Sequence, residues 1–180
     1  MNRYRSILNE VKKAVIGKDD QLEKILTAIL ARGHILLEDI PGVGKTTMAR
    51  AFAAAMSLQT RRMQFTVDVL PSDVIGFMAI DHDSGEPKLH PGAIFCNIFL
   101  ADEINRTSSR TQAALLEVME ENRITVDGVT YPAKSPFIVI ATQNPAGSAG
   151  TPMLPDSQLA RFMLLLHSGY PYTESEIRLL

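Results

Sequence analysis

The chain has 180 residues, 46% of them hydrophobic and 21% charged, which is typical of a single globular domain. A net charge of -2 does not favour a polyanion-binding surface, and no stretch approaches the ~18 apolar residues that span a bilayer. The N-terminal stretch lacks the apolar core of a signal peptide. The single cysteine, Cys96, lies in an apolar run, so we expect a buried thiol and a cytoplasmic, reducing environment.

Helices and strands alternate along the chain. Apolar residues recur at helical spacing from Leu22 to Leu30, and Gly33 is expected to end that helix. Two more helices are predicted over 46–56 and 108–122. Short apolar runs predict five buried strands, over 34–38, 62–67, 94–102, 137–142 and 162–167. This order predicts an α/β fold in which helices cover both faces of a five-stranded parallel sheet.

Ligands of such sheets bind at the carboxyl ends of the strands, so the segment after the first strand is the first candidate site. The usual phosphate-loop signature is G-x-x-x-x-G-K-[ST], and Asp39 stands here in place of its first glycine. Gly42 and Gly44 leave room for backbone N–H groups to surround phosphate oxygens. Lys45 can reach the β- and γ-phosphates. The residues expected to contact ATP in this loop are Pro41, Gly42, Val43, Gly44, Lys45, Thr46 and Thr47.

A pair of acids follows another predicted strand. Asp102 and Glu103 come directly after the apolar run 98–101. Alone, two such acids are often only an exposed strand end. Downstream of a phosphate loop, they predict that the Thr46 hydroxyl ligates Mg²⁺, that Asp102 holds the ion through water, and that Glu103 is the general base for the attacking water.

Two further polar residues follow later strands. Asn144 could orient water beside the γ-phosphate, although an Asn-Pro pair is commonly just a turn. Arg161 is either a surface arginine or an arginine finger for a neighbouring subunit. Near the middle of the chain, Asp127-Gly128 between two β-rich runs predicts a hairpin with a type I′ turn.

Together these motifs resemble the MoxR family of AAA+ ATPases, over nearly the whole chain. The matching stretches are VIGKDDQ, EDIPGVGKTT, RMQFTVDVLPSDVIG, PGAIFCNIFLADEINR, TQAALLEVMEE, ITVDGVTYP and FIVIATQNP. In that family Asp also occupies the place of Asp39, which favours a working loop.

The resemblance assigns roles to residues. It implies Lys45 and Thr46 as Walker A, Asp102 and Glu103 as Walker B, Asn144 as sensor 1, Arg161 as the finger, and Val15, Ile16 and Gly17 beside adenine. It also implies a helix-two insert at 77–92 and a pre-sensor-one hairpin at 123–135. Ala160 departs from the family, which usually has Asp there. Residues 1–170 would form the large nucleotide-binding domain and 171–180 the start of a helical lid, whose absence would leave hydrolysis weak.

The family's functions suggest a chaperone-like ATPase that uses ATP and Mg²⁺, forms hexamers and remodels partner proteins, including von Willebrand A domain proteins. One alternative is a nucleic-acid motor, because related AAA+ helicases grip DNA with a similar hairpin. The hairpin tip here contains Asp127 and no Lys or Arg, so nucleic-acid binding is not expected. A second alternative is a nucleotide-binding module without turnover. The histidines show no spacing typical of a metal site.

Overall fold

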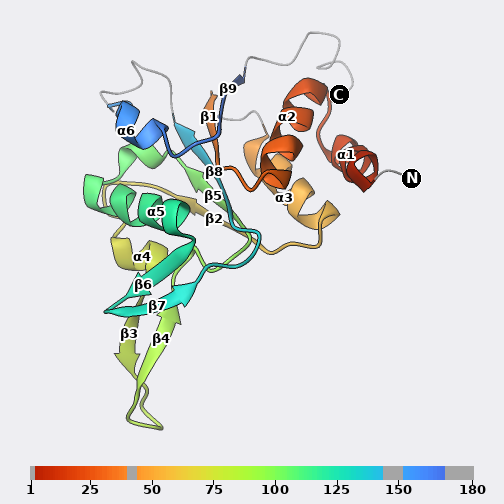
Figure 1. Cartoon of the computed structure of the whole chain (residues 1–180). Helices are drawn as coiled ribbons and strands as arrows, with labels where there is room; N and C mark the ends of the chain where they lie inside the picture. The colour runs from red at the N-terminus through yellow and green to blue at the C-terminus, as the bar shows by residue number, and fades with distance from the viewer. Residues whose placement is uncertain (1–2, 40–43, 144–151, 169–180) are drawn as a thin grey trace.

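The computed structural model describes residues 3–39, 44–143 and 152–168. Its centre is a five-stranded parallel sheet in the order β2-β5-β8-β1-β9 (Figure 1). The strands are β1 (Ile35–Asp39), β2 (Thr60–Gln64), β5 (Ile98–Asp102), β8 (Ile138–Gln143) and β9 (Leu164–Ser168). The predicted α/β fold with a five-stranded parallel sheet is therefore confirmed.

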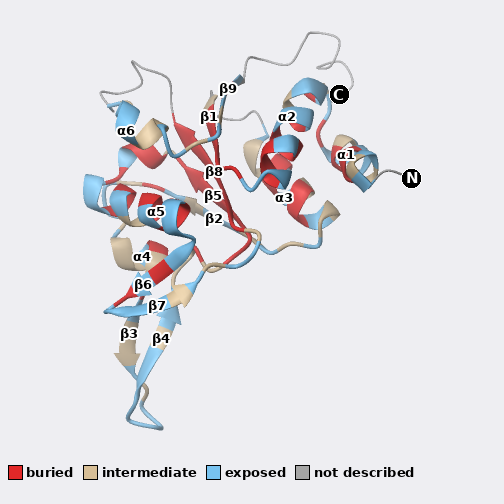
Figure 2. Ribbon diagram, viewed as in Figure 1, coloured by how far each residue is buried: buried red, intermediate tan, exposed pale blue. Residues whose placement is uncertain are grey.

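Helices cover both faces of this sheet, as Figure 1 shows. One face packs against α1 (Arg3–Ala14), α2 (Asp19–Leu30) and α3 (Lys45–Ala55). The other packs against α4 (Pro71–Ile75), α5 (Ser109–Glu121) and α6 (Asp156–Leu159). Successive strand residues alternate between the two cores: Ile35 and Leu37 belong to the first, and Leu36 to the second. The central strands are therefore buried on both sides (Figure 2).

His34 joins the start of the sheet to α5. Its Nδ1 accepts a hydrogen bond from the backbone N–H of Val139 at 3.0 Å, so Nε2 carries the proton and donates to the carbonyl of Met119 at 3.0 Å. Burial lowers the pKa of His34, which keeps the ring neutral. This histidine is therefore part of the packing between the helix and the sheet.

Some predicted boundaries are wrong. The strand expected over 94–102 begins only at Ile98, because the backbone N–H of Ile94 pairs instead with the carbonyl of Val74 in α4. The residues before Ile98 are still buried: Cys96 is fully buried, and burial raises the pKa of its thiol to about 11. Apolar character therefore indicated burial here but did not indicate strand pairing.

Two antiparallel hairpins project from the sheet domain. The helix-two insert is β3 (Gly76–Ile80) with β4 (Pro87–Pro91), which extends away from the sheet in Figure 1. The second hairpin is β6 (Arg123–Val126) with β7 (Val129–Pro132). Positive φ angles of 49° at Asp127 and 82° at Gly128 match the predicted type I′ turn. The Asp127 carboxylate accepts a hydrogen bond from the Met78 N–H at 3.0 Å, which ties the two hairpins together.

Gly92 fastens the insert to the domain, and we expect Gly92→Ala to loosen it. A Cβ at Gly92 would collide with the carbonyl oxygen of Val74 and the backbone nitrogen of Gly76, and neither backbone atom can swing aside. The substitution should lower the free energy of unfolding by about 1–3 kcal/mol, measured by urea denaturation. Gly85→Ala is the control, because Gly85 has open space around it and only a positive φ of 71°. An equal loss in both variants would contradict the collision.

Candidate functional site

The carboxyl ends of β5, β8 and β1 lie side by side at the upper edge of the sheet in Figure 1. Lys45 is the first residue of α3 and is half-buried, as is Thr46, while Thr47 is exposed. Of the predicted loop residues, Pro41, Gly42 and Val43 lie outside the described residues. The structure therefore describes the predicted loop only from Gly44 onward, at the N-terminus of α3.

Gly44 has the geometry that a phosphate loop needs. It is the N-cap of α3 with φ 82°, a left-handed conformation that a side chain would strain. Among the residues that the structure describes, no atom lies within 4 Å of a Cβ placed there, so this part of the turn leaves open space. The 11-residue helix that follows directs its first N–H groups toward that space. These features fit the phosphates of ATP.

Asp102 ends β5, the strand between β2 and β8. Its side chain is only 10% exposed, and its Oδ1 accepts a hydrogen bond from the Thr142 hydroxyl at 3.3 Å. Its Oδ2 lies 2.6 Å from Nε of Arg62, on the neighbouring strand β2. A buried carboxylate with one ordered hydroxyl and one cation beside it is held in a fixed orientation.

Glu103 is the next residue, and its backbone turns sharply away from the strand. Its φ of 56° is left-handed, and its N–H donates to the Thr142 hydroxyl at 2.9 Å. The side chain is 19% exposed, and Oε2 accepts from Nη1 of Arg106 at 2.7 Å. Thr142 therefore fixes both acids, and the turn places the Glu103 carboxylate beyond the end of the strand.

Sequence reasoning missed Arg62, Arg106 and Thr142. Arg62 and Thr142 reach Asp102 from strands 40 residues away in each direction, so only the register of the sheet reveals them. Arg106 follows Glu103 by three residues across the 3₁₀ turn Ile104–Arg106. The sequence DEINR carried that signal, because residues three apart face each other on a helical turn.

The donor set fits a magnesium ion. Mg²⁺ prefers oxygen ligands and keeps several waters, so one carboxylate and one hydroxyl suffice beside nucleotide phosphates. Thr46 would supply the hydroxyl, and Asp102 would hold the ion through water. Within the part of the chain that the structure describes, no group of three or more His, Cys, Asp or Glu residues could form a metal site made of protein ligands alone.

The remaining predicted residues are more scattered. Asn144 lies outside the described residues, although the buried strand β8 ends directly before it. Val15 is buried and Ile16 is 37% exposed, in the turn between α1 and α2, and Gly17 has a positive φ of 77°. α1 packs against α3, the helix that begins at Lys45. The turn between α1 and α2 therefore lies in the same helical layer as α3.

Arg161 lies away from these acids, just after α6. Its Nε is 2.9 Å from Oε2 of Glu120 in α5, and its Nη1 donates to the Ser157 carbonyl at 3.4 Å. Its side chain is 39% exposed beside a hollow of about 320 Å³ that α5 and α6 line. None of its contacts within the described ranges involves Lys45, Asp102 or Glu103.

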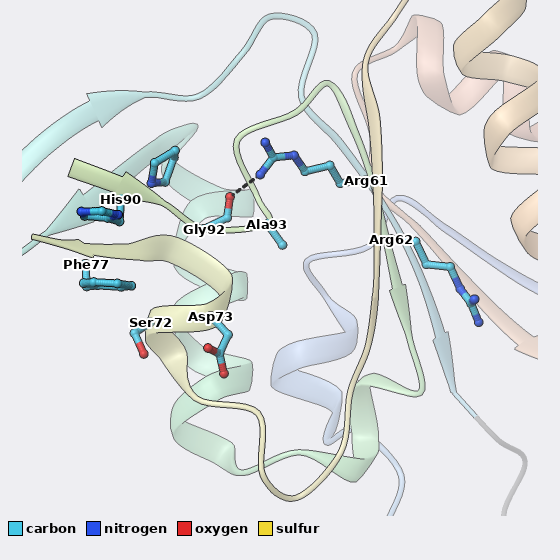
Figure 3. Close-up of a pocket in the computed structure, with 9 residues that line it drawn as sticks. Arg61, Arg62, Ser72, Asp73, Phe77, His90, Gly92 and Ala93 are labelled. Atoms are coloured by element: carbon cyan, nitrogen blue, oxygen red, sulfur yellow. Dashed lines mark hydrogen bonds between the residues drawn. The ribbon is translucent and has the colours of Figure 1, made fainter. Parts of the chain in front are cut away.

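A separate pocket of about 460 Å³ lies between β2 and the helix-two insert (Figure 3). Arg61 points into it and donates to the Gly92 carbonyl at 2.9 Å, and the rings of Phe77 and His90 stack 5.1 Å apart at its rim. Arg62 points to the other side of β2, toward Asp102. The adjacent residues of this edge strand therefore serve the insert and the acid site separately.

No helix among residues 3–39, 44–143 and 152–168 is both long and apolar enough to cross a membrane.

A family model described as "ATPase family associated with various cellular activities (AAA)" matches residues 34–164. The chain is 49% identical over 173 residues to Uncharacterized protein YeaC of Bacillus subtilis, covering 96% of this chain and 54% of that protein. It is 42% identical over 167 residues to Chaperone MoxR1 of Mycobacterium tuberculosis, covering 93% and 44% respectively.

A solved structure shows the same fold. The crystal structure of a candidate ATPase from Cytophaga hutchinsonii aligns with a TM-score of 0.88 at 42% identity, over 98% of this chain and 54% of that one. The chain thus spans about half the length of the relatives it matches. The family model covers most of the chain and the named relatives agree with it, so the chain belongs to the MoxR family of AAA+ ATPases.

Proposed function

We propose that residues 1–170 are the large nucleotide-binding domain of an ATPase that remodels or activates partner protein complexes in the cytoplasm. The observation that supports this proposal is that α3, with Gly44 as its N-cap and Lys45 as its first residue, follows β1, while Asp102 and Glu103 end the parallel strand β5 at the same edge of the sheet. The likeness to Chaperone MoxR1, at 42% identity, supports a chaperone role. From the resemblance to the MoxR family, we also propose a homo-oligomer, a hexamer, whose clients include von Willebrand A domain proteins.

In this proposal each residue has one task. Lys45 and the N–H groups at the start of α3 bind the phosphates. Thr46 and Asp102 hold Mg²⁺, which neutralises charge on the transferred phosphoryl group when bound. Glu103 accepts the proton of the attacking water, while Arg106 and Thr142 keep its side chain and backbone in place.

The β6–β7 hairpin favours a protein partner over nucleic acid. Residues 124–132 contain no Lys or Arg, and phosphate contacts require such cations. Asp127 at the tip is committed to the Met78 N–H of the insert. The two linked hairpins expose Phe77, Ile80 and Val129, with side chains suited to protein contact.

Lys45→Ala tests the nucleotide site. The variant should bind a fluorescent ATP analogue at least about 100-fold more weakly, because a side-chain cation for the β- and γ-phosphates is lost. A titration of the 180-residue chain with the analogue and Mg²⁺ measures this. Arg50→Ala is the matched control, because Arg50 is an exposed cation of the same helix. Equal affinity of the Lys45→Ala variant and the unchanged chain would contradict the proposed function.

A further inference from the structure

Glu38 joins the ends of three neighbouring strands. The register of the sheet places it in β1 opposite Gln143 of β8 on one side and His167 of β9 on the other. Its side chain is 15% exposed, and both carboxylate oxygens are engaged. Oε1 accepts from Gln143 Nε2 at 2.5 Å, and Oε2 lies 2.8 Å from His167 Nδ1. One carboxylate thus connects residues 105 and 129 positions further along the chain.

Gln143 extends this connection. The residue is fully buried, and while its Nε2 donates to Glu38, its Oε1 accepts from the backbone N–H of Leu154 at 3.4 Å. Both ends of the amide are used, which fixes its orientation. Leu154 is buried and lies just before α6, the helix that leads to Arg161. The hydrogen bonds therefore run from β9 through β1 and β8 to the segment that precedes Arg161.

The hydrogen bonds that join His167, Glu38, Gln143 and Leu154, here called the Glu38 relay, lie beside the predicted nucleotide site. Glu38 directly precedes Asp39 and the phosphate loop, and Gln143 directly precedes Asn144. We propose that Glu38 is a positioning residue that fixes the end of β1, which leads into the predicted phosphate loop, relative to the end of β8 and to the segment before Arg161. The proposal rests on the proposed function, since it requires nucleotide to bind the loop.

Charge and burial support a coupling role. The backbone hydrogen bonds already pair β1 with β8 and β9. If the side chain at position 38 only had to pack between these strands, an apolar residue would be sufficient there. A carboxylate there must be hydrogen-bonded to offset its desolvation, so its partners are held in specific positions. Charge-assisted hydrogen bonds are also roughly twice as strong as neutral ones. A change in the position of Glu38 is therefore expected to act on Gln143 and Leu154.

Hydrogen exchange measured by mass spectrometry tests this coupling in the 180-residue chain, with and without a non-hydrolysable ATP analogue and Mg²⁺. In the unchanged chain, nucleotide should slow exchange at 44–48 and also at 138–143 and 152–155. In Glu38→Ala the slowing at 44–48 should remain. At 138–143 and 152–155, the factor by which nucleotide slows exchange should be about tenfold smaller than in the unchanged chain. This is the size expected for a lost hydrogen bond to a charged group.

Two variants keep the test decisive. Glu38→Gln should restore most of the distant slowing, because the amide oxygen can still accept a hydrogen bond from Gln143 Nε2. His167→Ala removes only the outer end of the relay, at a side chain that is 73% exposed, and should leave the slowing at 152–155 within about threefold of the unchanged chain. His167→Ala therefore controls for the loss of a surface contact. If Glu38→Ala does not fold, Gln143→Met replaces it in the test. That variant should also lose the slowing at 138–143 and 152–155.

Enzyme kinetics in the full-length protein give a second measurement. Glu38→Ala should lower kcat about tenfold and change KM by less than about threefold, because positioning of the reacting groups is lost and binding is kept. Unchanged nucleotide-dependent slowing at 138–143 and 152–155 in Glu38→Ala would overturn the inference alone. Absence of slowing at 44–48 in the unchanged chain would overturn the proposed function, and the inference with it.

Discussion

Glu103→Gln is expected to lower the rate of phosphate release from ATP by about 10²–10⁴-fold in the full-length protein, while ATP affinity stays within about twofold. An amide cannot accept the proton of the attacking water. The substitution is otherwise conservative, because the amide oxygen can still accept from Arg106 and the backbone N–H still donates to Thr142. Asp102 remains in place to hold Mg²⁺. Binding and hydrolysis should therefore separate in this variant.

Single-turnover phosphate release and a titration with a fluorescent ATP analogue measure the two effects. Arg106→Gln is the informative comparison, because it removes the cation that holds the Glu103 carboxylate and leaves the carboxylate itself. Its rate should fall less, by about tenfold, the effect of losing a single charged hydrogen bond. Parental turnover by the Glu103→Gln variant would exclude Glu103 as the base.

The sheet could be predicted from the sequence because its signal is local. Each central strand is buried on both faces, and a continuous apolar run such as 137–142 records that burial directly. The turn at Asp127-Gly128 was equally local, because only a few residue pairs accept two positive φ angles. By contrast, α1 was missed: its buried face consists of only Ile7, Leu8 and Val11 among many polar residues.

The partners within the candidate site were not local and could not be predicted. Arg62 meets Asp102, and Glu38 meets Gln143, only because the strands pair in a particular order and register. A shift of one residue in either pairing would turn these side chains to the opposite face of the sheet. Motif spacing identified Asp102 and Glu103, since those acids follow a single strand. The surrounding groups that orient them required the three-dimensional structure.

Arg161 pairs with one acid, Glu120, which lies outside the candidate phosphate site of its own chain. Its Nε is paired with Glu120 at 2.9 Å, in the layer formed by α5 and α6. An arginine held there is 39% exposed and makes no described contact with Lys45, Asp102 or Glu103, so it can serve the phosphates of a neighbouring subunit. An arginine finger of this kind contributes about 10³–10⁵ in rate in related phosphoryl transfer.

Arg161→Ala should therefore abolish most turnover in the assembled full-length protein without weakening ATP binding. Glu120→Gln is the control, because it breaks the same ion pair but keeps the guanidinium, and it should cost far less activity. Mixing Arg161→Ala with Lys45→Ala subunits tests action between subunits. Each is inactive alone, but mixed assemblies contain some sites where an intact loop faces an intact finger. Steady-state phosphate release should recover at intermediate ratios, and no recovery despite demonstrated co-assembly would rule out the finger role.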